Sequence, residues 1–600
     1  MSYTLNRRVL GAILFTIVLS ILLFSMSWSV VSQTEPPHVP RPYLVADINP
    51  GPDTSYPDYL TAGSETLYAF ASDAEKRGMW ATDGSEAGTQ FLTETFPGSP
   101  YTYAPLYGTP IAQYGAPTTI GDNLYYVDND EVAGDELWVS DGSPTGTRKI
   151  KEIANGTSTF PGYYLGNLTP LNESELLFRS YDDVNGSELW ITDGTITNTR
   201  ILTDIVPGPD SAWPYSLIHV NDLVYFRAND AVLGDALWRT DGTAEGTEFA
   251  VDLPEENYGG FLLGLSQVDG LLFFANYDAT NGVEYWRSDG TPAGTWLLKD
   301  IAPGSSGSFF YDESTSIGFE GNFYFMASNL GDNGVELWRS DGSQENTILF
   351  KDINPGAGSS RPAWFEVVNG RLFFTADDGV NGRELWISDG TEVGTNMVLD
   401  INPSGDGIVI NTLYNFYIPA KATLNDLYFF TADDGVHGTE LWQSDGTAVG
   451  TVMVMDISPG PASSHPGNLT VLGNTLYFVA EDGVHGREIW ALSHTAIAED
   501  DLVVTKMAQP VTIIFLENDN YLDPDQLEIT VTAQPQFGSV VLNGFSFIYT
   551  PDFGYIGPDS FIYTLSDSIS EPESATIYID VEGDALYLPF ALQSSVLDEP

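Results

Sequence analysis

The feature that most constrains this chain is a short sequence that returns along most of its length. In its clearest form it reads Glu-Leu-Trp-Gln-Ser-Asp-Gly-Thr, from Glu440 to Thr447. Its copies follow one another at intervals of 48 to 58 residues. The tryptophans that mark them are Trp80, Trp138, Trp190, Trp238, Trp286, Trp338, Trp386, Trp442 and Trp490. Repeats of this length are typical of propellers and arrays, in which each unit buries its apolar surface against its neighbours.

Each unit predicts four short strands separated by turns. In one representative unit the expected strands cover 427–431, 440–444, 452–457 and 467–472, with turns at 433–438 and at Pro459-Gly460. The runs Leu-Tyr-Phe-Phe and Val-Met-Val-Met are apolar on both faces, so each small sheet must be covered on both sides. Four-stranded sheets stacked face to face around an axis meet that requirement. The first interpretation is a β-propeller, and a β-solenoid is the second.

The two ends of the repeat region predict how it closes. Residues 43–51 and 58–61 match only the second half of a unit, whereas residues 475–490 match only the first half. Together they make one complete unit, which is expected to join the two ends of the repeat region. The predicted fold class is therefore all-β, a large β-propeller of about nine four-stranded blades closed by a split blade, followed by a β-sandwich.

The repeats resemble those of bacterial proteins that carry the motif Glu-Leu-Trp-x-Ser-Asp-Gly-Thr-x-x-Gly-Thr. The match is close from Glu384 to Thr391 with Gly394-Thr395, is weaker at Gly78-Met79-Trp80, and is lost after Trp490. The resemblance covers about three quarters of the chain. It implies a secreted or surface-attached bacterial protein and brings no catalytic residues with it.

The segments outside the repeats predict export and a second domain. Residues 1–32 read as a signal peptide, with Arg7-Arg8 before an apolar run, or as an uncleaved N-terminal anchor; residues 33–42 form a linker before the repeats at 43–495. Residues 500–582 alternate short strands with turns and predict a β-sandwich. They resemble bacterial immunoglobulin-like or cadherin-like modules. Residues 583–600 are a tail whose apolar stretch is too short to span a bilayer.

Charge and cysteine content exclude several classes of protein. The formal net charge is −61, from 83 acidic and 22 basic residues. Binding to nucleic acid requires clustered Lys and Arg, so no nucleic-acid partner is expected, and anionic membranes are excluded in the same way. A membrane is expected to hold the chain only through an uncleaved N-terminal segment. The absence of cysteine excludes disulfides, thiolate metal sites and a cysteine nucleophile.

Acidic turns are the candidate metal sites, with calcium as the candidate cofactor, because calcium takes six to eight oxygen ligands. Ordinary turn chemistry is the alternative interpretation of the same residues. The sandwich domain adds further aspartates if it follows calcium-binding cadherin-like relatives. The candidate ligands are Asp377, Asp378, Glu384, Asp433, Asp434, Glu440, Asp519, Asp559 and Asp567.

The Asp-Gly pairs of the motif and the arginines after its tryptophan predict structural roles. Asp-Gly favours tight turns, and Arg239, Arg287 and Arg339 occupy equivalent positions in successive units. His437 and His485 stand where asparagine appears in other copies, which indicates a polar turn residue. No nucleophile triad, zinc spacing or phosphate-binding glycine loop is evident.

These observations predict an extracellular or cell-surface protein that binds or adheres to a glycan or protein ligand through propeller loops. A secreted hydrolase or lyase acting on polysaccharides is the first alternative, and catalytic residues are then expected in loops that break the repeat, at 101–117 and 404–422. A structural component of a surface layer is the second. The sequence singles out no catalytic residue, so the expectation leans away from an enzyme.

Overall fold

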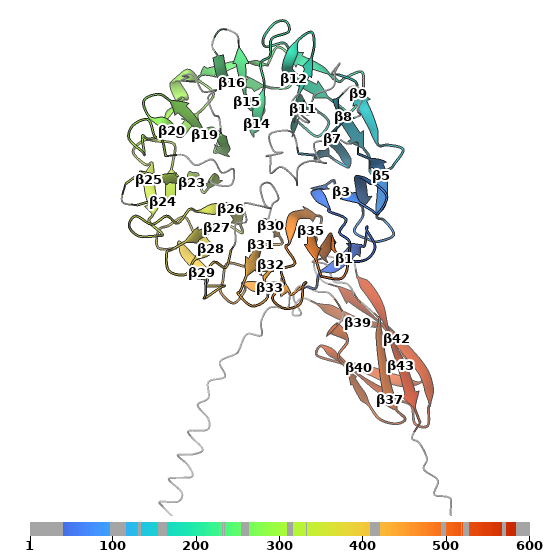
Figure 1. The fold of residues 1–600 in the computed structure, drawn as a ribbon. Helices are drawn as coiled ribbons and strands as arrows, with labels where there is room; N and C mark the ends of the chain where they lie inside the picture. The colour runs from blue at the N-terminus through green and yellow to red at the C-terminus, as the bar shows by residue number, and fades with distance from the viewer. Residues whose placement is uncertain are drawn as a thin grey trace, which may run out of the picture. The chain divides into compact units, whose positions relative to one another are not determined.

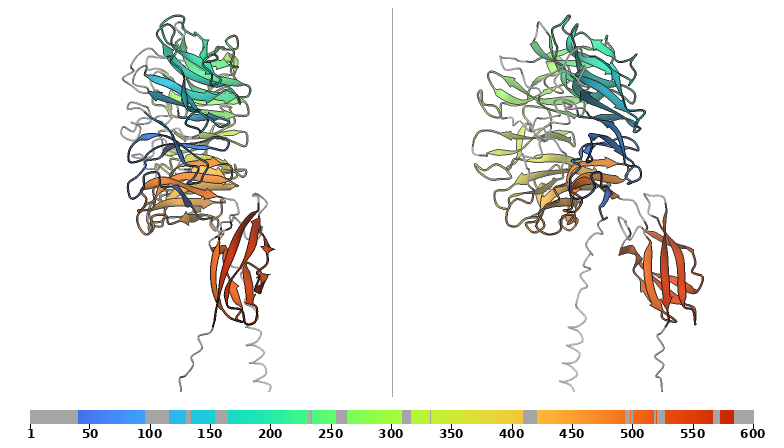
Figure 2. Two further views of the ribbon diagram at one scale, coloured as in Figure 1. Left: turned by 90° about the vertical axis from the view of Figure 1, so that its right-hand side faces the viewer. Right: turned by 45° about the vertical axis from the view of Figure 1, so that its right-hand side comes forward.

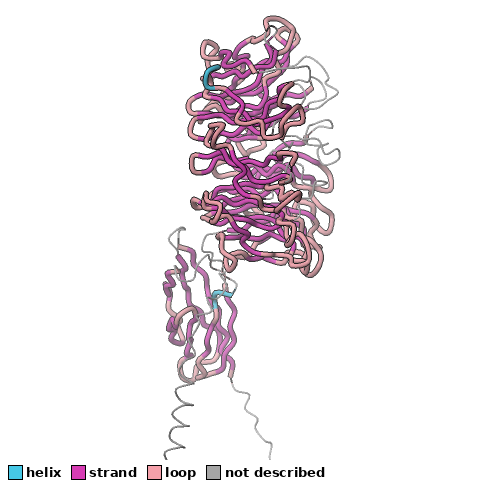
Figure 3. Tube along the Cα trace, turned by 90° about the vertical axis from the view of Figure 1, so that its left-hand side faces the viewer, coloured by secondary structure: helices cyan, strands magenta, loops and turns pink. Residues whose placement is uncertain are grey.

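The computed structural model describes residues 40–95, 116–129, 134–153, 165–230, 232, 234–253, 263–308, 316–331, 333–408, 421–493, 498, 500–517, 519, 527–566 and 572–583. Strands and loops make up nearly all of this part of the chain, with two short 3-10 turns, η2 (Pro292–Gly294) and η3 (Phe515–Glu517) (Figure 3). None of the described helical segments has the length and apolar character needed to cross a membrane. The predicted signal peptide or anchor, the linker up to residue 39 and the tail from residue 584 lie outside the described residues.

The described residues of the repeat region form nine antiparallel sheets of four strands each, numbered here in chain order (Figure 1). Sheet 1 consists of β2 (Asp58–Ala62), β3 (Leu67–Ser72), β4 (Arg77–Thr82) and β5 (Gln90–Glu94), and sheet 2 of β6 (Thr118–Ile120), β7 (Asn123–Asn129), β8 (Asp135–Ser140) and β9 (Arg148–Lys151). Sheet 3 consists of β10 (Gly166–Pro170), β11 (Leu176–Asp182), β12 (Gly186–Thr192) and β13 (Arg200–Thr203), and sheet 4 of β14 (Tyr215–Val220), β15 (Leu223–Asp230), β16 (Gly234–Thr240) and β17 (Glu248–Asp252).

The colour run of Figures 1 and 2 follows the sheets in chain order into the second half of the repeat region. Sheet 5 consists of β18 (Leu263–Val268), β19 (Leu271–Asp278), β20 (Gly282–Ser288) and β21 (Trp296–Leu297), and sheet 6 of β22 (Ser316–Phe319), β23 (Asn322–Ser328), β24 (Val335–Ser340) and β25 (Ile348–Lys351). Sheet 7 consists of β26 (Ala363–Val368), β27 (Arg371–Asp377), β28 (Arg383–Ser388) and β29 (Asn396–Leu399), and sheet 8 of β30 (Lys421–Leu424), β31 (Leu427–Asp433), β32 (Thr439–Ser444) and β33 (Val452–Met455).

Sheet 9 combines strands from both ends of the repeat region. It has the order β1 (Tyr43–Ala46), β36 (Arg487–Ser493), β35 (Thr475–Glu481) and β34 (Gly467–Leu472). β1 pairs with β36 in antiparallel register, with Leu44 opposite Trp490. One strand therefore comes from the N-terminal end and three from the C-terminal end.

The set of strands that makes up sheet 9 differs from the prediction, which placed residues 58–61 in the same unit as residues 43–51. β2 instead pairs with β3 and opens sheet 1. The reason is the length of the connections: β2 and β3 are joined by a tight turn, whereas a loop of eleven residues separates β1 from β2. The sheet boundary falls in that longer loop, one strand earlier than the sequence pattern suggested.

Apolar side chains fill the spaces between consecutive sheets, as the strands that are apolar on both faces predicted. The motif residues Leu385 and Trp386 point to opposite faces of sheet 7. Trp386 packs with Tyr324 and Phe350 of sheet 6, whereas Leu385 packs with Tyr428 and Phe430 of sheet 8. A similar cluster joins sheet 9 to sheet 1, in which Val479 and Ile489 pack with Leu60 and Leu67.

The remaining strands form two facing sheets with a core of their own. One contains β37 (Asp501–Lys506), β43 (Glu573–Glu582), β42 (Gly557–Ser566) and β39 (Glu528–Ala533), and the other β38 (Val511–Ile513), β41 (Ser546–Pro551) and β40 (Gly538–Asn543). Phe515, Phe547, Phe561 and Tyr563 are buried between them. This part of the chain is a β-sandwich, as predicted.

Candidate functional site

The glutamate two residues before the motif tryptophan, which is present in seven of the nine copies, is a buried structural anchor. Glu384 and Glu440 have no exposed surface. Glu384 accepts hydrogen bonds from the backbone N–H groups of Ile401 at 3.1 Å and Gly407 at 2.9 Å. Glu440 accepts equivalent bonds from Ile457 at 3.1 Å and Ser464 at 2.9 Å. Each carboxylate thus fixes the loop that leads from its own sheet to the next.

Burial changes the protonation of these glutamates. It raises the pKa of Glu384 and of Glu440 from 4.5 to about 7, although the backbone N–H donors oppose the shift. The neighbouring carboxylates of Asp400 and Asp456 raise the two pKa values further. Burial likewise raises the pKa of Glu188 to about 8. A buried acid of this kind is at the same time a hydrogen-bond acceptor and a group that titrates near neutral pH.

The predicted turn aspartates accept hydrogen bonds from their own turns. Asp377 accepts one from the N–H of Gly379 at 2.7 Å, and Asp378 accepts two, from Val380 at 2.9 Å and Asn381 at 2.8 Å. These bonds are those expected of aspartate in a tight turn.

The equivalent turn of sheet 8 contains a histidine. Asp433 accepts from Gly435 at 2.7 Å, and Asp434 accepts from the N–H of His437 at 2.9 Å. Nδ1 of His437 lies 2.7 Å from a carboxylate oxygen of Asp434, and this contact raises the pKa of the imidazole. In sheet 7 the amide of Asn381 makes the corresponding contact with Asp378 at 2.7 Å. The interpretation of His437 as a polar turn residue agrees with this geometry.

The two candidate aspartates of the sandwich domain that can be placed contact tyrosines. Asp519 accepts from the hydroxyl of Tyr563 at 2.8 Å, and Asp559 from that of Tyr549 at 2.7 Å. Asp559 also accepts from the N–H of Gln536 at 2.9 Å. The third candidate, Asp567, lies outside the described residues.

Among the described residues, no three His, Cys, Asp or Glu side chains are grouped so that they could hold a metal ion. Glu384 and Glu440 already face backbone donors, which occupy the positions that a cation would take. Calcium binding by the acidic turns stays a prediction.

The Asp-Gly turn of the motif is a hydrogen-bonded structure, as predicted. Asp389 accepts from the N–H of Thr391 at 2.9 Å and from its hydroxyl at 2.6 Å. A Cβ placed on Gly394 would lie 2.0 Å from the Asp389 carboxylate, so the second glycine of the motif makes room for that side chain. The turn therefore belongs to the frame of the repeat.

Variation between copies occurs at a position that the sequence interpretation missed. In four loops between sheets, a small residue and a proline enclose one residue whose φ is positive, with values from 44° to 51°. The enclosed residues are Tyr56, Trp213, Arg361 and His465. Positive φ is rare for large side chains, and strained positions of this kind concentrate at ligand sites. The sequence signal that could have revealed these positions is a recurring pattern of a small residue, one variable residue and a proline. It stands directly before the strands β2, β14, β26 and β34.

The small residue before each of these four positions is held by the buried glutamate. The N–H of Ser55 donates to Glu488 at 3.0 Å, and that of Ala212 donates to Glu188 at 3.1 Å. The prolines that follow are buried, whereas Tyr56, Arg361 and His465 are exposed and Trp213 is partly exposed. A fixed backbone thus presents an aromatic or cationic side chain in each of the four loops.

The other predicted places for functional residues are only partly visible. Residues 101–115 and 409–420 of the two repeat-breaking loops lie outside the described residues. The three arginines after the motif tryptophan have local partners: Arg239 pairs with Glu248 at 2.5 Å, Arg287 stacks on Trp296 and Arg339 lies over Phe350. These contacts agree with separate structural roles for the three arginines.

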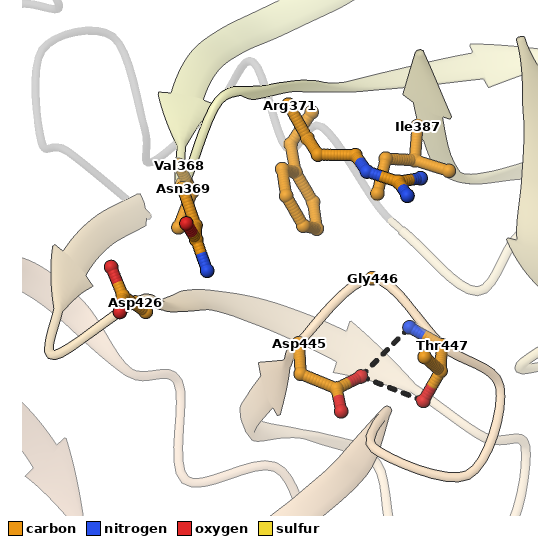
Figure 4. Close-up of a pocket in the computed structure, with 9 residues that line it drawn as sticks. Val368, Asn369, Arg371, Ile387, Asp426, Asp445, Gly446 and Thr447 are labelled. Atoms are coloured by element: carbon orange, nitrogen blue, oxygen red, sulfur yellow. Dashed lines mark hydrogen bonds between the residues drawn. The ribbon is translucent and has the colours of Figure 1, made fainter. Parts of the chain in front are cut away.

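A pocket of about 230 Å³ opens between sheets 7 and 8, at the opposite end of β26 from Arg361 (Figure 4). The turn between β30 and β31 contributes Asp426, and the motif turn of sheet 8 contributes Asp445 and Thr447. The residues that line it are Val368, Asn369, Arg371, Phe373, Ile387, Asp426, Asp445, Gly446 and Thr447. Val368, Phe373 and Ile387 are buried, whereas the polar side chains that line the pocket are exposed.

Comparison with protein families assigns the second domain. Residues 493–580 match the family described as Bacterial Ig domain, which agrees with the predicted immunoglobulin-like sandwich. The chain therefore combines propeller-like sheets with a bacterial Ig domain. A comparison with curated proteins found no match.

Solved structures with propeller domains resemble the chain only distantly. A puromycin hydrolase is 14% identical with a TM-score of 0.32, over 62% of this chain and 58% of that one. The propeller domain of the Trilobed protease from Pyrococcus furiosus is 13% identical with a TM-score of 0.28, over 57% of this chain and 98% of that domain. A puromycin-hydrolyzing peptidase from Mycobacterium tuberculosis is 11% identical with a TM-score of 0.31, over 69% and 64% of the two chains. At these values no activity is transferred to this chain.

Proposed function

We propose that this chain is an exported binding protein that recognises a glycan or protein ligand through the loops that contain Tyr56, Trp213, Arg361 and His465. The observation that carries the proposal is the contrast at these positions between a repeated backbone and side chains that differ in chemistry. By contrast, the residue that holds the backbone of each of these four loops is always a buried glutamate, namely Glu488, Glu188, Glu336 and Glu440. Tyrosine, tryptophan and arginine, three of the four residue types found here, are the ones that contribute most to binding surfaces.

We further infer that the nine sheets are the blades of one closed ring. Two observations support a ring over an open array: β1 completes the sheet of β36, and an apolar cluster joins sheet 9 to sheet 1. Each sheet would then be covered on both faces, as its apolar strands require. Class averages of the purified protein by electron microscopy test the inference, and an open arc or two separate rings would contradict it.

Export and a location outside the cell or on its surface are part of the same proposal. The match of residues 493–580 to a bacterial Ig domain supports it, because such domains are typical of extracellular proteins. The arginine pair Arg7-Arg8 and the apolar run after it supply the expected targeting signal. Fractionation of cells that produce the full-length chain tests this part, since retention in the cytoplasm would contradict it.

The binding proposal is tested with glycan arrays and with pull-down of extracellular proteins. Wild-type protein is expected to retain a ligand, and the double variant Tyr56→Ala with Trp213→Ala is expected to lose most of that retention because it removes two aromatic contacts. The matched control is Ile196→Ala, which truncates a side chain that is 64% exposed in a motif turn. Equal retention by the double variant and the control would contradict the proposed ligand face.

A further inference from the structure

We propose that the face that holds Tyr56, Trp213, Arg361 and His465 binds a protein whose contact surface combines aliphatic side chains with lysine or arginine. The inference rests on the proposed function, because it names the class of partner for the same face. It is carried by a second repeated feature, an exposed valine in the turn between the second and third strands of five sheets. These valines are Val184, Val232, Val380, Val436 and Val484.

The side chains of the five valines are not used by the fold, since they are 61% to 89% exposed. Only the backbone takes part in the turn, where the N–H of Val380 donates to Asp378 at 2.9 Å and that of Val484 donates to Asp482 at 2.8 Å. In sheet 5 Thr280 makes the same bond at 2.8 Å, so the turn does not require an apolar residue. Single exposed apolar residues are common, but five at one repeated position indicate a contact made beyond the fold.

The turns that contain these valines lie beside the loops of the proposed ligand face. The N–H of Trp213 donates at 3.1 Å to the carbonyl of Ser187, which follows the turn of Val184. On the other side, the N–H of Asn229, just before the turn of Val232, donates at 2.7 Å to the residue that precedes Trp213. Trp213 therefore stands between two turns that each expose a valine.

The loop of His465 has the same two neighbours. The guanidinium of Arg487, directly after the turn of Val484, donates to the carbonyl of His465 at 2.6 Å. The N–H of Thr439, directly after the turn of Val436, donates to the same loop at 2.9 Å. Exposed valines thus alternate with the variable loop residues on sheets 8 and 9.

Tyr56 extends this group of side chains to sheet 1. The hydroxyl of Ser55 donates to the carbonyl of Arg487 at 3.3 Å, and the N–H of Ser72 donates to the carbonyl of Ser55 at 2.8 Å. Sheets that pack face to face lie about 10 Å apart, so a group that spans sheets 8, 9 and 1 is about 20 Å long. A protein partner can contact several of these side chains at once, whereas a small molecule reaches one valine at a time.

The charge around the valines favours a basic partner. The turns 182–186, 377–382, 433–438 and 481–486 contain eight carboxylates and no lysine or arginine. Arg383 and Arg487, which follow two of these turns, donate to backbone carbonyl groups of the loops. The eight carboxylates outnumber the exposed cation Arg361, so they repel an acidic protein and attract lysine or arginine. A glycan gains less here, because a valine side chain neither donates nor accepts a hydrogen bond.

Fluorescence anisotropy with the full chain tests the proposal with labelled peptides of equal length. One peptide consists of leucine and lysine, one of leucine and glutamate, and one of serine and lysine. The leucine-lysine peptide is expected to bind, the serine-lysine peptide to bind about tenfold more weakly, and the leucine-glutamate peptide not to bind. Absence of binding by the leucine-lysine peptide, or equal binding of either comparison peptide, would overturn the proposal.

A triple variant, Val380→Thr with Val436→Thr and Val484→Thr, assigns the binding to the turns. It should weaken binding of the leucine-lysine peptide about tenfold, because a hydroxyl group replaces a methyl group at three contacts. The fold should tolerate threonine, since Thr280 occupies the equivalent position in sheet 5. Undiminished binding by this variant would contradict the assignment.

The matched control is the double variant Val393→Thr with Val449→Thr. These two valines are 89% and 60% exposed, but they lie in motif turns, at the opposite end of the third strand. The control should bind the peptide as the wild type does. A loss equal to that of the triple variant would show that any exposed valine attracts the peptide, and would overturn the proposed face.

The same measurements separate this inference from the proposed function. If the wild type retains a glycan that Tyr56→Ala with Trp213→Ala loses, and the leucine-lysine peptide does not bind, the basic protein partner is wrong and the proposed function stands. If the triple variant loses the peptide but the variant of Tyr56 and Trp213 retains every ligand, the valine turns are supported and the role of these two loop residues is wrong. Circular dichroism spectra that match those of the wild type are required of every variant.

Discussion

At Glu384, backbone N–H groups from two points of one loop converge on a single carboxylate, Ile401 at 3.1 Å and Gly407 at 2.9 Å. The same arrangement recurs at Glu440 with Ile457 and Ser464. Because the glutamate is fully buried, loss of the acceptor leaves N–H groups without a partner in the interior. The stability of the loops therefore depends on this one residue type.

Glu384→Gln is expected to destabilise the repeat region by about 1–3 kcal/mol, because the amide turns a donor toward one of the two N–H groups. Urea unfolding followed by tryptophan fluorescence measures the change. All 13 tryptophans precede residue 491, so this signal excludes the bacterial Ig domain. The control is Glu392→Gln at an exposed position, which should leave the unfolding midpoint unchanged.

The stability of the repeat region should fall as the pH rises from about 5 to 8. Burial raises the pKa of Glu384, Glu440 and Glu488 to about 7, above the value of 4.5 expected in the unfolded chain. Between these two values the folded state binds more protons than the unfolded state, so stability is lost as pH increases through the window. Urea midpoints at pH 5 and pH 8 test the sign.

The variant Glu384→Gln supplies the control for this pH effect. It removes one of the titrating groups, so its midpoint should change less between the two pH values than that of the wild type. A stability that rises from pH 5 to pH 8 would contradict the protonation of the buried glutamates in the folded state.

Each motif turn is an element in which an aspartate and a glycine depend on one another. Gly394 lies so close to Asp389 that a Cβ would be 2.0 Å from the carboxylate. Two copies have asparagine instead of this glycine, and there the amide donates to the aspartate, Asn198 to Asp193 and Asn346 to Asp341, both at 2.6 Å. A side chain is therefore acceptable at this position only if it can hydrogen-bond the carboxylate.

Gly394→Ala is accordingly expected to lower the melting temperature, whereas Gly394→Asn should leave it close to that of the wild type. The two variants differ in whether the new side chain repels the carboxylate or donates to it. In an Asp389→Ala background, Gly394→Ala should cost less, which a double-mutant cycle measures. Equal losses for alanine and asparagine would show that backbone freedom, and not the contact with Asp389, requires the glycine.

The sequence predicted the elements well where local chemistry decides them. The length of the repeat, its apolar strands and its Asp-Gly turns indicated an all-β fold of four-stranded sheets. As expected, Leu385 and Trp386 fill the spaces between neighbouring sheets. The sequence indicated Glu384 only as a candidate calcium ligand. Its role as an anchor could not be predicted, because its donors are backbone N–H groups of Ile401 and Gly407, 17 and 23 residues away, which leave no side-chain signal.

At the scale of the molecule, the two ends of the repeat region are joined by buried contacts. Val45 of β1 is 3% exposed and packs with Tyr477 and Ile489 of sheet 9 and with Leu60 of sheet 1. The N–H of Ile48 donates to Glu488 at 3.2 Å across a sequence separation of 440 residues. Buried apolar contacts and hydrogen bonds to Glu488 thus connect the two ends.

Val45→Asp is expected to destabilise the repeat region by about 3 kcal/mol or more, because it buries a charge without a partner. The loss should appear in the same tryptophan-detected urea transition. Tyr43→Thr, at a position that is 38% exposed on the same strand, is the control and should have a small effect. If Val45→Asp matched the control, β1 would contribute little to holding the ends together.

The position of β1 also sets an order of assembly. The ribosome delivers the N-terminal end first, yet the partner strand β36 is among the last parts of the repeat region to be made. For most of synthesis β1 has no partner in its own sheet, and the final docking step closes a contact of very long sequence separation, which is slow. Premature release of the chain would leave two exposed strand edges, so the interval before docking is when the protein is most open to aggregation and to proteolysis.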